Sequence, residues 1–250
     1  MGLDGVLRKR QRDPVGILNG IDPDVWAPER DRLLPFRFSI DDFSGKSLNK
    51  VRLQEVMGLP VRADIPLFAC VSRLAAQKGI DILCESLEEM LRQDMQFVLL
   101  GSGEVGMEEN LRRLSACFPS KCAIATRFDE GLLHLITAGA DFFTMPSRFE
   151  PCGLNQMFSQ LNGTIPIVHR TGGLNDSVID LTDDPEFATG IKFAPCDKNA
   201  LASAIFKGIV LFKSPELLAA FRRNCMKADF GWERVTEAYL NVYQSLFASC

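Results

Sequence analysis

Residues 146–154 (PSRFEPCGL) place an arginine, a glutamate and a cysteine on one short segment between two predicted elements. The apolar run over residues 140–145 predicts a buried strand, and residues 155–161 predict a helix. The segment is therefore expected to be a loop at the carboxyl end of a strand, where open α/β sheets bind ligands. The next helix would present its N-terminus to this loop, which favours anionic groups. Glu150 is the carboxylate that this loop would bring to a ligand.

Two other loops carry residues suited to phosphate binding. One follows a predicted strand over residues 164–168 and contains a threonine and two glycines: Thr171, Gly172 and Gly173. Paired glycines let backbone N–H groups approach a phosphate closely. The other follows a predicted strand over residues 67–70 and carries Arg73 and Lys78, whose charges could neutralise a pyrophosphate. Because a cation at a helix start opposes the helix dipole, this placement indicates a bound anion.

Gly101, Gly103 and Gly106 match the spacing of a dinucleotide-binding loop and follow a predicted strand. Such a fingerprint needs an acidic residue about 20 residues further on, at the end of the next strand. The next predicted strand ends near Arg127 with no acid in place. We therefore interpret the match as coincidental, and the loop around Gly101 stays a candidate for lining a nucleotide pocket.

Taken together, these loops resemble the glycogen and starch synthases, a family of retaining glucosyltransferases with two Rossmann-like domains that face a cleft. The segments that carry the resemblance run in the family's order along nearly the whole chain: residues 17–22 (ILNGID), 72–74 (SRL), 77–79 (QKG), 146–154 and 170–174 (RTGGL). The resemblance covers only the C-terminal half of that family. It implies that a glycine-rich loop of the N-terminal half, which helps bind donor and acceptor, belongs to a domain absent from this sequence.

The resemblance also assigns roles to matching positions. Arg73 and Lys78 would hold the donor's phosphates and stabilise the leaving diphosphate electrostatically, with no metal or other cofactor. Glu150 would lie near the donor glucose in a positioning and electrostatic role. Phe158 stands where other retaining sugar transferases have a second glutamate, which the synthase branch also lacks. Cys152, Gly153 and Leu154 would contact the sugar hydroxyls, and Thr171, Gly172 and Gly173 would bind the phosphates. Phe128 would stack on the base, Gly101 would line the nucleotide pocket, and Asn19 would lie in the interdomain segment.

The implied reaction transfers glucose from ADP-glucose or UDP-glucose to the non-reducing end of an α-1,4-glucan with retention, in glycogen or starch biosynthesis. The partners would be the sugar nucleotide, the glucan and the N-terminal domain. Because this chain would supply one wall of the cleft, we expect little synthase activity from it alone. Two other classes stay open: a nucleotide-binding module without catalysis, and a nicotinamide-dependent oxidoreductase, which only the Gly101 loop suggests. A sugar phosphorylase would need a pyridoxal-phosphate lysine, and none is identifiable.

The 250-residue chain is 46% hydrophobic and 24% charged, which is typical of a soluble globular protein. Its net charge of -4 gives no reason to expect nucleic acid or an anionic membrane as a partner. No apolar run reaches membrane-spanning length and no signal peptide is visible, so we expect a cytoplasmic location, or a plastid in a plant or alga. The eight cysteines form no Cys-x-x-Cys pair and the two histidines are isolated, which argues against a metal site.

Strand and helix patterns alternate along most of the chain and predict an α/β fold with a doubly wound, Rossmann-like parallel sheet. By resemblance, this is the C-terminal domain of a GT-B type, two-domain glycosyltransferase. Residues 1–28 are expected to be the interdomain segment and the end of the absent domain, residues 29–226 the nucleotide-sugar-binding domain, and residues 227–250 a helix that packs on the absent domain. Residues 33–47 predict a surface loop, and His134 is expected on a helix surface.

Overall fold

The computed structural model describes residues 4–10 and 14–248 and divides into two compact units. One unit spans Pro23–Ala228. The other combines the N-terminal residues up to Asp22 with the C-terminal residues from Asp229 onward. All six strands of the sheet lie in the larger unit.

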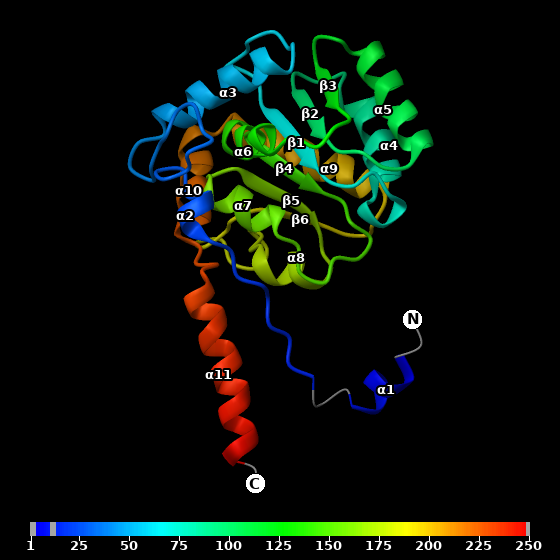
Figure 1. Cartoon of the computed structure of the whole chain (residues 1–250). Coiled ribbons are helices and arrows are strands. Elements are labelled where there is room, and N and C mark those ends of the chain that lie inside the picture. Colours follow the sequence, from blue (N-terminus) through cyan, green and yellow to red (C-terminus); the bar gives the residue numbers. More distant parts are fainter. Residues whose placement is uncertain (1–3, 11–13, 249–250) are drawn as a thin grey trace. The chain divides into compact units, whose positions relative to one another are not determined.

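The sheet has the strand order β3-β2-β1-β4-β5-β6, and every neighbouring pair is parallel (Figure 1). This confirms the predicted doubly wound, Rossmann-like fold. The order reverses between β1 and β4, so the loops after these two strands leave a crevice at the carboxyl edge of the sheet. The strand bounds are β1 (Leu67–Val71), β2 (Gln96–Leu100), β3 (Cys122–Ala125), β4 (Phe142–Met145), β5 (Ile165–His169) and β6 (Ile191–Phe193).

Helices cover both faces of the sheet, because successive strand side chains point to opposite sides and both sets are buried. Phe68 and Cys70 of β1 belong to a core shared with α4, α5, α9 and α10. Leu67 and Ala69 of the same strand belong to a second core shared with α3 and α6. The helix bounds are α2 (Pro23–Trp26), α3 (Ser44–Val56), η1 (Ala76–Lys78), α4 (Ile80–Met90), α5 (Val105–Cys117), α6 (Glu130–Gly139), α7 (Asn155–Leu161), α8 (Gly172–Ser177), α9 (Lys198–Phe212) and α10 (Pro215–Lys227).

The prediction of a surface loop over residues 33–47 is right only in part: residues 33–43 form no helix or strand, and most of them are exposed or half-buried. Leu34 and Phe38 are core residues, and α3 already begins at Ser44. The sequence does not reveal this helix because much of its buried face is polar, and hydrophobic periodicity detects only apolar faces. The buried polar side chains of α3 are Lys46, Asn49, Lys50 and Gln54.

The smaller unit contains α1 (Asp4–Lys9) and α11 (Trp232–Ala248). Its two chain segments meet where the Ile21 N–H donates to the Phe230 carbonyl at 2.9 Å. Apolar side chains of α11 such as Tyr243 are exposed, and the packing of this helix on another domain stays a prediction. No helix in the described parts of the chain has the length and apolar character that crossing a membrane requires.

Candidate functional site

Two adjoining cavities lie at the carboxyl edge of the sheet, where the strand order reverses. The smaller, of about 210 Å³, lies between the ends of β1 and β4, and the larger, of about 280 Å³, extends to the ends of β2 and β3. Both are lined by Ser72, Arg73 and Asn155. This is the position at which doubly wound sheets bind nucleotides.

Lys78 and Glu150 form an ion pair beside the smaller cavity. The Lys78 Nζ donates to the Glu150 Oε2, and the Ser147 Oγ donates to the same oxygen at 3.2 Å. Lys78 and Ser147 line the cavity, whereas the Glu150 side chain is buried next to it. The His169 ring is held behind this group, with its Nδ1 2.8 Å from the Ser147 carbonyl oxygen. The charge of Lys78 is therefore balanced within the protein.

Arg73 differs from Lys78, although the sequence predicts the same role for both cations. Its side chain is exposed and lines both cavities. Among the residues that the structure describes, none makes an ion pair or hydrogen bond with its guanidinium. Within that part of the chain, Arg73 is thus an uncompensated positive charge at the crevice, as a site for a phosphate group requires.

The glycines near the cavities let neighbouring loops pack backbone against backbone. Gly79 has a φ of 68°, and a Cβ there would lie 2.0 Å from the Pro146 carbonyl oxygen. A Cβ at Gly172 (φ 41°) or Gly173 would lie 2.3 Å from a carbonyl oxygen of the loop that contains Glu150. The Gly173 N–H donates to the Glu150 carbonyl at 3.0 Å, so this N–H serves loop packing. A phosphate cradle formed with Thr171 and Gly172 stays a prediction.

The loop around Gly101 has a similar explanation. A Cβ at Gly101 would lie 2.0 Å from the Ser72 carbonyl oxygen, and one at Gly103 would lie 2.2 Å from the Leu74 carbonyl oxygen. A Cβ at Gly106 would meet no neighbouring segment of the described chain within 4 Å, so nothing around it requires a glycine. Two of the three glycines are accounted for by loop packing, which supports the interpretation of the dinucleotide pattern as coincidental. Gly101 lines the larger cavity.

The other predicted substrate-binding residues divide into two groups. Phe128 is 89% exposed and lines the larger cavity, where its ring is free to meet a ligand. Residues 152–154 form the turn before α7, with Gly153 at a φ of 75°, and do not line either cavity. Asn19 belongs to the smaller unit. The roles of these last residues stay predictions.

Besides Ser72, three polar residues that line the smaller cavity were not predicted from the sequence to be site residues. The Thr144 Oγ1 donates to the Ala69 carbonyl at 2.8 Å, and the Asn155 Nδ2 donates to the Val71 carbonyl at 2.8 Å. Ser147 is the third, and its bond to Glu150 is described above. All three lie in or near the 146–154 segment, so their position in the sequence was the available signal.

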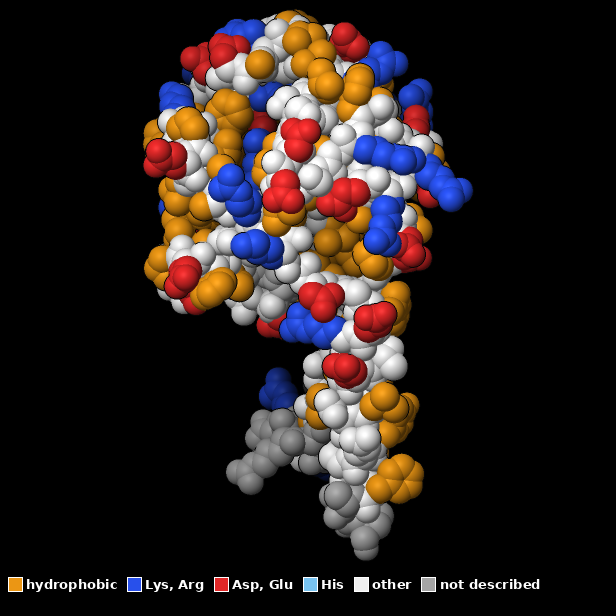
Figure 2. Space-filling model, turned by 90° about the vertical axis from the view of Figure 1, so that its left-hand side faces the viewer, with side chains coloured by type: hydrophobic (Ala, Val, Ile, Leu, Met, Phe, Trp, Pro, Cys, Tyr) orange, Lys and Arg blue, Asp and Glu red, His pale blue; other side chains and the backbone are white. Residues whose placement is uncertain are grey.

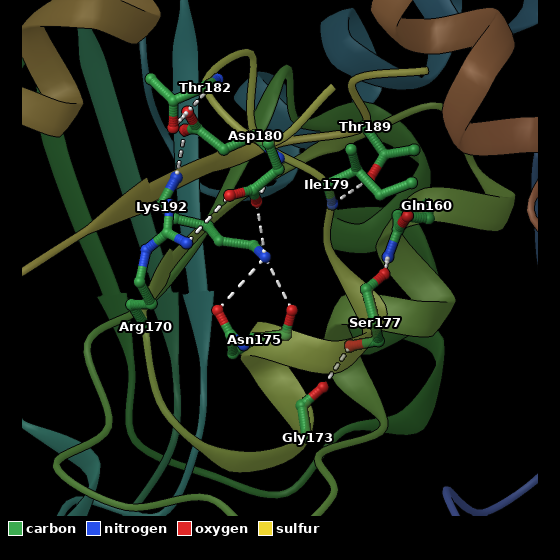
Figure 3. A network of polar contacts seen from close by, with 11 residues as sticks. Gln160, Arg170, Gly173, Asn175, Ser177, Ile179, Asp180, Thr182, Thr189 and Lys192 are labelled. Atoms are coloured by element: carbon green, nitrogen blue, oxygen red, sulfur yellow. Dashed lines mark hydrogen bonds and ion pairs between the residues drawn. The ribbon is translucent and has the colours of Figure 1, made fainter. Parts of the chain in front are cut away.

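A polar network supports the 170–175 segment from the side of β6 (Figure 3). The Lys192 Nζ donates to the Asn175 carbonyl at 2.7 Å and contacts the Asp183 carboxylate at 2.8 Å. Arg170 contacts the same carboxylate at 2.9 Å. These two cations hold the pKa of Asp183 well below its usual range. The network ties α8 at Asn175, and the chain just before α8 at Arg170, to Lys192 and Asp183.

His134 is buried, so its expected place on a helix surface is wrong. Its Nδ1 lies 2.6 Å from the Asp31 carboxylate, and its ring stacks on Trp26 at 4.0 Å. Cys70 lines the smaller cavity, and burial raises the pKa of its thiol to about 12, which disfavours a nucleophilic role. Within the described residues, no three His, Cys, Asp or Glu side chains are grouped to hold a metal ion.

The family model described as "Glycosyl transferases group 1" matches residues 65–209, which include the sheet and both cavities. The chain belongs to this family. Glycogen synthase of Anaeromyxobacter sp. (strain Fw109-5) is 47% identical over 248 residues, covering 99% of this chain and 52% of that protein. Glycogen synthase of Nitrosomonas eutropha is 43% identical over 248 residues, covering 98% and 49%. This chain thus spans about half the length of the curated relatives it matches.

Solved structures give the same picture. The catalytic domain of starch synthase IV from Arabidopsis thaliana, bound to ADP and acarbose, superposes with a TM-score of 0.90 at 35% identity, covering 98% of this chain and 51% of that one. Anabaena Alr3699/HepE, in complex with UDP and glucose, has a TM-score of 0.64 at 17% identity and covers 92% and 56%, which shows the fold alone. The likeness to the glycogen and starch synthases that the motifs implied is confirmed.

Proposed function

We propose that this group 1 glycosyltransferase chain is the donor-binding half of a glycogen or starch synthase. It would bind ADP-glucose and take part in the transfer of glucose, with retention, to the non-reducing end of an α-1,4-glucan. The observation that carries the proposal is the exposed Arg73 at the strand-order reversal, beside the Lys78–Glu150 pair. ADP rather than UDP is favoured because the 35%-identical starch synthase holds ADP.

The geometry suggests a role for each charged group. Arg73 would contact the diphosphate directly and stabilise the negative charge that grows on it as the glycosidic bond breaks. Lys78, whose charge Glu150 balances, would stay paired and contact the diphosphate as a hydrogen-bond donor. Glu150 would hold Lys78 in place and accept hydrogen bonds from the sugar. Phe128 would stack on the base. A second, N-terminal domain would complete the cleft, and a cytoplasmic location stays a prediction.

Two alternatives make different predictions. A nucleotide-binding module without catalysis would bind ADP but support no glucan elongation, even when joined to an N-terminal domain. A nicotinamide-dependent oxidoreductase would bind NAD, and the unconstrained Gly106 argues against it. Titration calorimetry with ADP and with NAD separates the second alternative, and elongation of a glucan primer by a two-domain protein separates the first.

The test of the phosphate assignment is ADP binding by Arg73→Ala. We expect its dissociation constant to rise about 10- to 100-fold, which corresponds to about 1.4–2.8 kcal/mol for a lost charge-assisted hydrogen bond. Arg113→Ala is the matched control, because Arg113 is an arginine on α5 whose guanidinium bonds only to Asn110 at 3.2 Å among the described residues. Equal ADP affinity in the wild type and Arg73→Ala would remove the assignment.

A further inference from the structure

A third cavity, of about 380 Å³, lies at the opposite, amino-terminal edge of the sheet, between α3 and α10. Asp141, the residue directly before β4, forms part of its wall, and Phe43 and Phe212 contribute apolar surface. We call it the α3–α10 cavity. Figure 2 looks onto the side of the molecule that carries these two helices and shows basic side chains recessed between hydrophobic ones.

The charges that line the α3–α10 cavity do not balance. Its lining includes three basic side chains, Lys46, Lys50 and Arg222, and a single acidic one, Asp141. The Asp141 carboxylate contacts the Lys50 Nζ at 2.7 Å and the Arg222 Nη2 at 2.6 Å. It also accepts the Leu67 N–H at 2.9 Å, so both of its oxygens are occupied. Subtracting one negative from three positive charges leaves an excess of two when Lys46 is protonated.

Lys46 has no carboxylate partner within the described residues, and its Nζ is fully occupied. The ammonium donates to the Ala138 carbonyl, the Asn162 carbonyl and the Thr164 Oγ1 at 2.6–2.9 Å. These acceptors account for all three N–H donors of an ammonium group. Burial, together with the nearby Arg222 charge, lowers the pKa of Lys46 well below its usual range. An anion in the cavity would favour the charged form of Lys46 and so offset both the burial and the repulsion from Arg222.

Arg222 offers the direct contact. Its side chain is 17% exposed and its Nη2 pairs with Asp141, whereas no described residue accepts a hydrogen bond from its Nη1. We propose that the α3–α10 cavity binds a phosphorylated small molecule, with its phosphate at Arg222 and Lys50 and its apolar part between Phe43 and Phe212. A phosphate monoester carries about −1.5 to −2 charges at pH 7, which matches the excess of positive charge.

Phenyl phosphate is the probe that tests this proposal, and Ser47 allows a test that leaves the buried charges intact. Ser47 is an exposed residue of α3 that lines the cavity. Ser47→Glu would place a carboxylate at the cavity, where it competes with the ligand, and Ser47→Gln is its neutral control of equal size. By titration calorimetry, we expect the wild type and Ser47→Gln to bind phenyl phosphate alike and Ser47→Glu to bind it at least tenfold more weakly.

Two further variants and excess ADP separate this cavity from the crevice at the other edge. Ala219→Trp fills the α3–α10 cavity without changing a charge and should also abolish binding. Arg113→Met removes an exposed arginine of α5 and should leave phenyl phosphate binding unchanged, and so should excess ADP, which would fill the crevice at the other edge of the sheet. Circular dichroism and urea unfolding check that each variant folds. Equal affinity of wild type, Ser47→Glu and Ala219→Trp, or loss of phenyl phosphate binding in the presence of excess ADP, would overturn the proposal. Orthophosphate should bind more weakly than phenyl phosphate; equal affinity would overturn the role of the apolar walls.

Discussion

Glu150→Gln separates the role of Glu150 from that of Lys78. Glutamine keeps the size of the side chain and its bond to Ser147, but it removes the negative charge that pairs with the Lys78 ammonium. The side chains of Lys78 and Glu150 are only 19% and 10% exposed, so their pairing is screened less than that of a surface salt bridge. We expect a loss of about 1.5–3 kcal/mol of unfolding free energy, the range for a hydrogen bond to a charged group.

The same substitution should strengthen ADP binding. In the wild type Lys78 is neutralised by Glu150, and a negative carboxylate lies near the diphosphate. With glutamine, Lys78 can turn its full charge to the phosphates, so we expect ADP to bind about three- to tenfold more tightly, or about 0.7–1.4 kcal/mol. Turnover by a two-domain protein should fall, because Lys78 would no longer be held in its catalytic position.

A double-mutant cycle with Lys78→Met tests the mechanism. If Glu150 acts through Lys78, Glu150→Gln should give no gain in ADP affinity once Lys78 is methionine. An equal gain in both backgrounds would refute that step, and weaker ADP binding by a folded Glu150→Gln protein would place Glu150 in the nucleotide site itself. Glu55→Gln is the control: its pair with Arg52 is 51% exposed on the arginine side and 49% on the glutamate side, and should be worth no more than about 1 kcal/mol.

Three other predictions follow from single sites. Phe128→Ala should weaken ADP binding by about 0.5–1.5 kcal/mol, the worth of an aromatic stack, with an unchanged melting temperature because the side chain is 89% exposed; unchanged affinity in calorimetry would contradict base stacking. Gly79→Ala should cost at least about 2 kcal/mol in urea unfolding, because its φ is 68° and a Cβ would lie 2.0 Å from the Pro146 carbonyl oxygen; a neutral effect would refute the loop-packing explanation. For Asp141, burial alone would raise the pKa, but the Lys50 and Arg222 charges outweigh it and lower the pKa below its usual value. A carboxylate whose pKa is lowered in the folded state stabilises the fold above about pH 4, and this stabilisation is lost as the pH falls through the pKa of the folded state. The difference in unfolding free energy between wild type and Asp141→Asn should therefore be widest near pH 7 and narrow below pH 4. A difference that does not change with pH would show that the charge of Asp141 is not responsible.

The strands could be predicted from the sequence because both faces of the sheet are buried, which makes each strand a short continuous apolar run such as LFAC before Val71. The site loops could be predicted because they follow those runs directly. The pairing of Lys78 with Glu150 could not, since 72 residues separate them and only the adjacency of β1 and β4 brings them together. The burial of His134 was hidden for the same reason: its partner Asp31 lies 103 residues away.

The glycines of the three site loops form a connected set of backbone contacts. The loop after β1 packs on the loop after β4 through Gly79, and the loop after β4 packs on the loop after β5 through Gly172 and Gly173. Gly101 ties the loop after β2 to Ser72, next to Arg73. Each contact leaves no space for a Cβ, so a side chain at any of these positions would push one loop away from the next. Because electrostatic stabilisation depends on charges that are already in position, these glycines would govern activity by fixing where Arg73 and Lys78 lie.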